Sequence, residues 1–261
     1  MPNESTRKTI FVAVAVCLVC SILVSTAAVT LKGLQKRNRE LDKLKNILNA
    51  GGIPADKGDL QRVYRERIRP VLLDLETGRF IEGDGTAELD PERFDIKAIS
   101  NHPEYSRPLS ADEDIAQIRR LPKVMVVYQV LEGASVSRYI LPVFGKGLWS
   151  TMYGFIALGA DLRTIEGFTY FEHGETPGLG GEVDNPVWKK SWIGKQAYDE
   201  SGKVIIRVIK GKVDPAGREA ASAIDGLSGS TLTTRGVDNT VRFWLGPLGY
   251  GPMIKQLKGE G

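Results

Sequence analysis

Residues 124–171 read VMVVYQVLEGASVSRYILPVFGKGLWSTMYGFIALGADLRTIEGFTYF and decide the fold. Four runs in this stretch are rich in Val, Ile and Tyr and are bounded by Gly or Pro, as β-strands are. They are 124–131, 135–142, 152–158 and 165–171. Short strands that follow one another closely favour antiparallel pairing. The stretch therefore predicts an α+β domain with a twisted, mostly antiparallel sheet and helices packed on it.

The segments on either side of this sheet are less regular. Residues 59–122 are charged and interrupted by Pro, which indicates short strands or helices separated by loops. After the sheet we expect a short helix or turn at 188–192 and another strand at 204–208. Apolar residues at helical spacing then predict a helix over 233–245.

Composition places the chain among globular proteins with one or two domains. It has 261 residues, of which 42% are hydrophobic and 26% are charged. The formal net charge is only +3, and no dense Lys/Arg run is interleaved with aromatic residues. A nucleic-acid partner is therefore excluded from the expected functions.

The N-terminal region contains an uncharged apolar run at 9–31, TIFVAVAVCLVCSILVSTAAVTL. As a helix it would span roughly 35 Å, enough to cross a bilayer with some tilt. A cleaved signal peptide is the alternative, but its apolar region is usually shorter, about 7 to 15 residues. Cys17 and Cys20 lie inside this run and are interpreted as small apolar residues of the membrane helix.

The predicted domain organisation has four parts. They are an N-terminal tail (1–8), a transmembrane helix (9–31), a juxtamembrane helix and linker (32–58) and a cofactor-binding domain (59–261). The excess of Lys and Arg after the span would keep the large domain in the cytoplasm, although long domains translocate largely regardless of such charges.

A hydroxyl-rich turn, DGLSGSTLTT at 225–234, leads into the last predicted helix. Free backbone N–H groups at a helix start suit a phosphate, and so does the positive end of the helix dipole. Ser, Thr, Asp and Gly at this place also serve ordinary helix capping, so the turn alone leaves both interpretations open.

Two further segments are candidates for a ligand site. The loop HGETPGLGGE at 173–182 has glycines that let its backbone approach a flat ligand, or it is a surface turn. The run GKGLWS at 145–150 carries Trp149, which either stacks on a cofactor or packs in the core. A metal site is not predicted, because His102 is the only histidine besides His173.

Together the three motifs resemble one family. G-x-G-L-W-S at 145–150, E-T-P-G-L-G at 175–180 and D-G-x-S-G-x-T at 225–231 occur in the order found in the C subunit of the Na+-translocating NADH:quinone oxidoreductase. The resemblance covers nearly the whole chain, including the single N-terminal membrane helix. Ser230 departs from the family pattern, which usually has Ala at this position.

The resemblance implies a covalent FMN cofactor joined through a phosphoester to Thr231, installed by a flavin transferase that takes the FMN moiety from FAD. Ser230, Thr233 and Thr234 are alternative attachment points. The other residues that the resemblance places around the flavin are Ser228, Gly229, Leu148, Trp149, Glu175, Thr176 and Leu179. Apolar side chains are expected on the flavin rings and polar ones at their edge.

The implied function is an electron relay within a membrane complex that reduces ubiquinone with NADH and exports Na+. The chain has no G-x-G-x-x-G fingerprint, so another subunit oxidises NADH, and no acid/base catalyst is expected here. By resemblance, the chain is a single-pass protein of the bacterial inner membrane with its large domain in the periplasm. The alternatives are the G subunit of an Rnf-type ferredoxin:NAD complex and a membrane-tethered scaffold without a cofactor.

Overall fold

The computed structural model describes residues 6–56, 58–86 and 88–259. The chain divides into two compact units, Met1–Lys43 and Leu44–Gly261.

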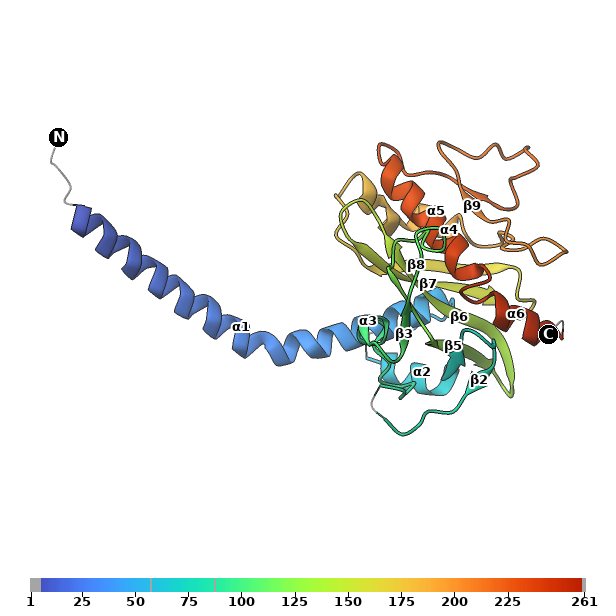
Figure 1. Cartoon of the computed structure of the whole chain (residues 1–261), viewed down its shortest axis with the longest axis horizontal. Coiled ribbons are helices and arrows are strands. Elements are labelled where there is room, and N and C mark those ends of the chain that lie inside the picture. Colours follow the sequence, from blue (N-terminus) through green and yellow to red (C-terminus); the bar gives the residue numbers. More distant parts are fainter. Residues whose placement is uncertain (1–5, 57, 87, 260–261) are drawn as a thin grey trace. The chain divides into compact units, whose positions relative to one another are not determined.

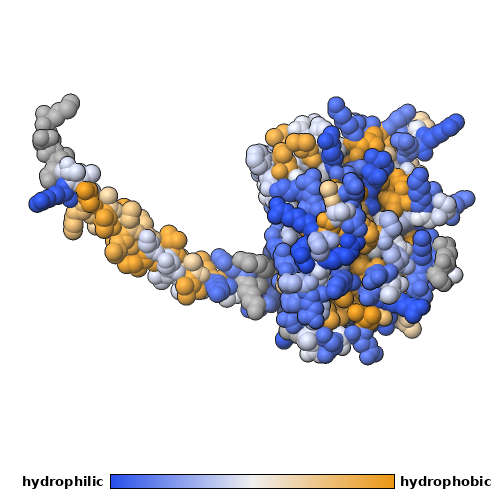
Figure 2. Space-filling model, viewed as in Figure 1, coloured by the Kyte–Doolittle hydropathy of each residue, from blue (hydrophilic) through white to orange (hydrophobic). Residues whose placement is uncertain are grey.

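The first unit contains most of the helix α1 (Thr6–Ala50) (Figure 1). Its Thr6–Gln35 part is long and apolar enough to cross a membrane by length and composition. None of its most apolar window is buried, and Figure 2 shows apolar side chains along it. The predicted span at 9–31 lies inside this part, and Cys17 and Cys20 are exposed on it. The predicted tail at 1–8 lies partly outside the described residues.

The end of α1 belongs to the second unit. Ile47 and Leu48 are almost fully buried in the domain core, although they fall in the segment predicted as a juxtamembrane helix and linker outside the cofactor-binding domain. The helix ends just before Gly51 and Gly52, and Gly52 has a φ of +66° that a glycine adopts readily. The folded domain therefore draws core residues from positions before 59.

A six-stranded sheet forms the centre of the second unit, in the order β2-β1-β5-β6-β7-β8 with every neighbouring pair antiparallel. The strands are β1 (Ile68–Asp74), β2 (Phe80–Ile81), β5 (Val124–Glu132), β6 (Ser135–Lys146), β7 (Thr151–Gly159) and β8 (Ile165–Glu172). Strands β5 to β8 correspond to the four runs predicted from the sequence. Their long buried stretches explain why apolar residues occupy both faces of the sheet.

Helices and two small sheets surround this centre (Figure 1). The helices are α2 (Leu60–Arg67), α3 (Ile96–Asn101), η1 (Gly180–Asp184), α4 (Pro186–Lys190), α5 (Thr231–Leu245) and α6 (Gly251–Lys258). The small sheets pair β3 (Ser106–Pro108) with β4 (Arg120–Pro122) and β9 (Arg207–Val208) with β10 (Ala223–Ile224), the latter in parallel. The predicted α+β fold with a mostly antiparallel sheet is confirmed.

The long helix α5 packs against β6 and positions its own N-terminus beside the end of that strand. Two aromatic side chains fix the contact: Trp244 Nε1 donates to the carbonyl of Phe144 at 2.7 Å, and Tyr250 Oη donates to that of Pro142 at 2.6 Å. The predicted strand at 204–208 is wrong in extent, because only Arg207–Val208 pairs with another strand. Val204 makes just an isolated bridge to Tyr198.

Candidate functional site

A cavity of about 360 Å3 lies where the three sequence motifs meet. We call it the main cavity. It is lined by Leu148, Trp149, Glu175, Thr176, Leu179, Gly180, Gly229, Ser230, Thr231, Leu232 and Thr233. All the predicted site residues line it except Ser228, which is exposed on the turn before α5. Gly180, Leu232 and Thr233 are the lining residues that the predicted set did not contain.

Glu175 is the most constrained side chain of the main cavity, with only 5% of its surface exposed. Its Oε1 accepts hydrogen bonds from the backbone N–H groups of Trp149 (3.0 Å) and Ser150 (3.2 Å). Its Oε2 accepts from the N–H of Leu148 (3.1 Å) and from Thr233 Oγ1 (2.6 Å). One carboxylate therefore joins the 147–150 turn, the 175–180 loop and the first turn of α5.

These hydrogen bonds also determine the charge of the carboxylate. Burial by itself raises the pKa of Glu175, but the hydrogen bonds from Thr233 and from the backbone N–H groups of Trp149, Ser150 and Leu148 outweigh it. The net result is a pKa below the ordinary value, so the Glu175 side chain is ionised at neutral pH.

Glycines make room for this carboxylate. A Cβ at Gly147 would lie 2.5 Å from Glu175 Oε1, and one at Gly180 would lie 2.9 Å from Oε2. A Cβ at Gly236, in α5, would overlap the carbonyl oxygen of Lys146. Because real Cβ atoms do not approach so closely, glycine at these three positions allows the turn, the loop and the helix to meet.

The hydroxyl groups at the start of α5 divide into two kinds. Ser230 Oγ donates to Thr233 Oγ1 at 2.8 Å, and Thr234 Oγ1 donates to the Ser230 carbonyl at 2.9 Å, all three residues being buried. Thr231 is exposed at the edge of the main cavity. Within the described part of the chain its hydroxyl makes no hydrogen bond, and the same holds for the exposed Ser228.

The N-terminus of α5 is open to a ligand. Ser230 is the N-cap residue, but its side chain makes no capping hydrogen bond because it is bonded to Thr233. The first turn also holds no acidic residue. The first helical N–H groups and the positive end of the helix dipole therefore lie beside the Thr231 hydroxyl.

Two hydrogen bonds of Asp225 hold the turn before α5 in place. Trp188 Nε1 donates to the Asp225 carbonyl at 2.8 Å, and the Asp225 carboxylate accepts from the N–H of Val213 at 2.7 Å. Trp188 in turn packs edge-on against Phe168 and Trp192. This aromatic cluster connects the turn to the sheet through β8.

The loop on the other side of the cavity is fixed by His173. Its Nδ1 accepts from the N–H of Glu175 at 3.2 Å, so Nε2 carries the proton donated to Asp184 Oδ2 at 2.8 Å. Asp184 also pairs with Lys189 at 2.9 Å. His173 thus has a structural use, and the described residues hold no group of three or more possible metal ligands.

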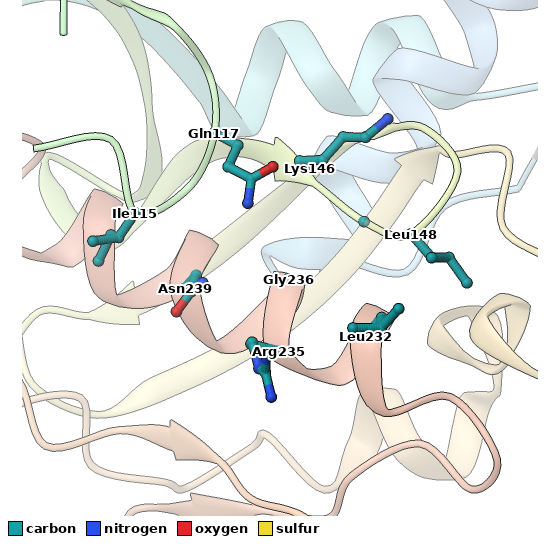
Figure 3. Close-up of a pocket in the computed structure, with 9 residues that line it drawn as sticks. Ile115, Gln117, Lys146, Leu148, Leu232, Arg235, Gly236 and Asn239 are labelled. Atoms are coloured by element: carbon teal, nitrogen blue, oxygen red, sulfur yellow. The ribbon is translucent and has the colours of Figure 1, made fainter. Parts of the chain in front are cut away.

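A smaller hollow of about 170 Å3 adjoins the main cavity and shares Leu148 and Leu232 with it (Figure 3). In Figure 3 it lies along the side of α5 that carries Asn239, with Gln117 and Lys146 above it. Gln117 has a φ of +54°, a conformation that non-glycine residues adopt at a cost. The hollow contains none of the hydroxyl groups described above.

The chain is similar to known proteins, both around the main cavity and over nearly its whole length. A family model described as "FMN-binding domain" matches residues 147–246, which include every residue that lines the main cavity. The chain is 44% identical over 260 residues to the C subunit of Na(+)-translocating NADH-quinone reductase from Yersinia pestis, covering 98% of this chain and 94% of the relative. It is 46% identical over 262 residues to the protein of the same name in Pseudomonas aeruginosa, covering 99% and 98%.

Two solved structures resemble the fold. A crystal structure of Shewanella oneidensis NqrC superposes with a TM-score of 0.76 at 33% identity, covering 85% of this chain and 99% of the other. A crystal structure of the C subunit of Na(+)-translocating NADH-quinone reductase from Parabacteroides distasonis has a TM-score of 0.60 at 28% identity, covering 84% and 96%.

Proposed function

The chain belongs to the family formed by the C subunit of Na(+)-translocating NADH-quinone reductase, and we propose that it relays electrons through FMN joined covalently to Thr231. We propose that the chain does this as a subunit of a membrane complex that reduces ubiquinone with NADH and exports Na+. The two relatives are named as C subunits of Na(+)-translocating NADH-quinone reductase, and the similarity extends over 94% and 98% of their lengths. This favours the proposed function over the Rnf-type alternative.

The observation that carries the proposal is the state of the hydroxyl groups at the start of α5. Thr231 is exposed, borders the main cavity and makes no hydrogen bond to the described residues. Ser230, Thr233 and Thr234 are buried and hydrogen-bonded to one another or to backbone. A separate flavin transferase can therefore reach the Thr231 hydroxyl without unfolding the start of α5.

The residues of the main cavity suit FMN. The open N-terminus of α5 provides N–H groups for the phosphate, while Leu148, Trp149 and Leu179 are exposed apolar side chains for the isoalloxazine. Thr176 and Gly229 lie at the rim. FMN supplies the electron-accepting and electron-donating chemistry, and the surrounding residues position it and adjust its potential.

Attachment requires a flavin transferase and FAD. The Thr231 oxygen attacks the FMN phosphorus of FAD, so that the Thr231 O–P bond forms, the pyrophosphate O–P bond breaks and AMP leaves. The hydroxyl proton passes to a base of the transferase. No acid or base of this chain is needed, which agrees with a Thr231 side chain that has no described hydrogen-bond partner.

The test is mass spectrometry of the full chain co-expressed with a flavin transferase. The native Thr231 peptide is expected to carry an FMN-sized mass increase, Thr231→Val none, and Ser230→Ala the same increase as the native chain. An unmodified native peptide would support the scaffold alternative. A modification that persists in Thr231→Val would move the attachment point to Ser228 or another hydroxyl.

For localisation we propose that α1 is retained as a membrane anchor and that Leu44–Gly261 faces the periplasm, against the Lys/Arg count. Cysteine labelling tests this in a chain whose Cys17 and Cys20 are replaced by Ser. A single cysteine introduced at the exposed Ser201 should react with a membrane-impermeant reagent added to spheroplasts. Labelling only after lysis would place the domain in the cytoplasm.

A further inference from the structure

The Glu175 carboxylate has no hydrogen-bonding capacity left for a ligand. A carboxylate accepts about four hydrogen bonds, two on each oxygen. Oε1 is bonded to the N–H groups of Trp149 and Ser150, and Oε2 to Leu148 N–H and Thr233 Oγ1. Glu175 also has no proton to donate when ionised. It therefore does not contact the edge of a flavin as a hydrogen-bond partner, in contrast to the expectation from its motif.

The charge on Glu175 is fixed in place. Gly147 and Gly180 close around the carboxylate, and no described salt bridge includes it. The nearest Lys side chain along the turn, Lys146, donates instead to the carbonyl of Trp149 at 3.1 Å. The negative charge is therefore balanced by N–H and O–H dipoles rather than by a cation, and it borders the main cavity.

We propose that Glu175 lowers the reduction potential of the flavin in the main cavity through this fixed charge, without bonding to the flavin. The proposal rests on the proposed function, because it needs FMN in this cavity. An electron added beside a fixed negative charge is disfavoured by Coulomb repulsion, and the repulsion is stronger where water is excluded. Four dipoles hold the carboxylate in place, so it cannot turn away when the flavin is reduced.

The experiment is a spectroelectrochemical titration at pH 7 of the flavinylated full chain in detergent, with flavin content measured by mass spectrometry. Glu175→Gln keeps the side-chain size and removes the charge. It is expected to raise the midpoint by at least about 59 mV, a tenfold change in the reduced-to-oxidised ratio for a one-electron step. Glu172→Gln is the matched control, because Glu172 is half-exposed and paired with Lys97, and its midpoint should equal the native one.

Thr233→Val gives a change of opposite sign. It removes one dipole that balances the carboxylate and leaves the charge, so the midpoint should fall below the native value. A general distortion of the 147–150 turn would instead move both variants in the same direction. If Glu175→Gln does not fold or bind flavin, the Thr233→Val midpoint decides by itself: a lower value supports the proposal, and an equal or higher one overturns it.

The outcomes separate this proposal from the proposed function. A native chain without covalent flavin would contradict the proposed function. A native chain that carries flavin, with a Glu175→Gln midpoint equal to or below the native one, would overturn only the role of Glu175.

Discussion

On one side of the main cavity the 147–150 turn is held by a carboxylate that is buried to 5% exposure and accepts four hydrogen bonds. On the other side Ser228, Gly229 and Thr231 are exposed, and no hydroxyl of theirs is bonded within the described residues. We call the first side the clamped wall; it consists of residues 145–150 and 175–180, and the turn packs against Gly236 of α5. We call the second side, residues 228–232, the open wall. The residues that set the geometry are hydrogen-bonded and buried, and Thr231, the residue proposed for flavin attachment, is accessible.

Gly236 and Gly229 give the largest expected contrast between the walls. Gly→Ala inside a helix normally stabilises by about 1 kcal/mol, but at Gly236 the new Cβ overlaps Lys146 O, and we expect a loss of about 3 kcal/mol. Gly229→Ala on the open wall should lose about 1 kcal/mol, the cost of its φ of +70°. Urea unfolding of the full chain in detergent measures both. Gly58→Ala, with nothing within 4 Å, is the control.

Glu175→Gln should destabilise the clamped wall by about 2 kcal/mol at pH 7, because buried donors lose their acceptor. The folded pKa of Glu175 is lowered, so its stabilisation is complete above the unfolded value of 4.5 and is lost as pH falls through the folded pKa. The difference between the native chain and Glu175→Gln should therefore shrink below pH 4.5. Unfolding curves at several pH values check this, and a difference that grows on acidification would show that the carboxylate is not ionised.

Ser230→Ala tests the border between the walls. Among the described residues the Ser230 hydroxyl bonds only to Thr233 Oγ1, so its loss should cost about 1 kcal/mol. Flavin attachment should be unaffected. Thermal unfolding gives the first quantity and peptide mass the second. Lost attachment with native stability would mean that Ser230 takes part in the modification.

Ser228→Ala should have the smallest effect. The side chain is exposed and makes no hydrogen bond to the described residues, so the change in stability should stay within about 0.5 kcal/mol. Attachment should match the native chain by mass spectrometry. Reduced attachment here, with Thr231 intact, would extend the functional part of the open wall beyond the main cavity.

The central sheet was predictable because the runs that form strands β5 to β8 are rich in Val, Ile and Tyr and are bounded by Gly or Pro. Strand β1 was not. It follows the charged helix α2 and contains Pro70, which usually argues against a strand, yet it pairs with β5 over its whole length. The residues that it pairs with lie 50 to 62 positions later, and nothing local identifies such a pairing.

Most of the residues that line the main cavity could be predicted from the sequence, but the hydrogen bonds that they make could not. These lining residues were predicted from the resemblance of the three motifs to one family. From spacing alone, the turn before α5 was open to helix capping as well as to phosphate binding. The structure shows that the Ser230 side chain does not cap the helix. The contact between Glu175 and the flavin edge that the resemblance implies stays a prediction, which our proposal for Glu175 opposes. The donors to the Glu175 carboxylate come from segments 25 to 58 residues away, so its saturation is visible only in three dimensions.

The open start of α5 has a further consequence for the choice of hydroxyl. Successive residues of an α-helix are turned by about 100° around its axis. Ser230, Thr233 and Thr234 therefore lie within an arc of about 100° and are buried, whereas Thr231 lies outside this arc and is exposed. Four chemically similar hydroxyls are thus distinguished by helical phase. A modifying enzyme does not need to recognise the residue type if only one of these four hydroxyls, that of Thr231, is exposed.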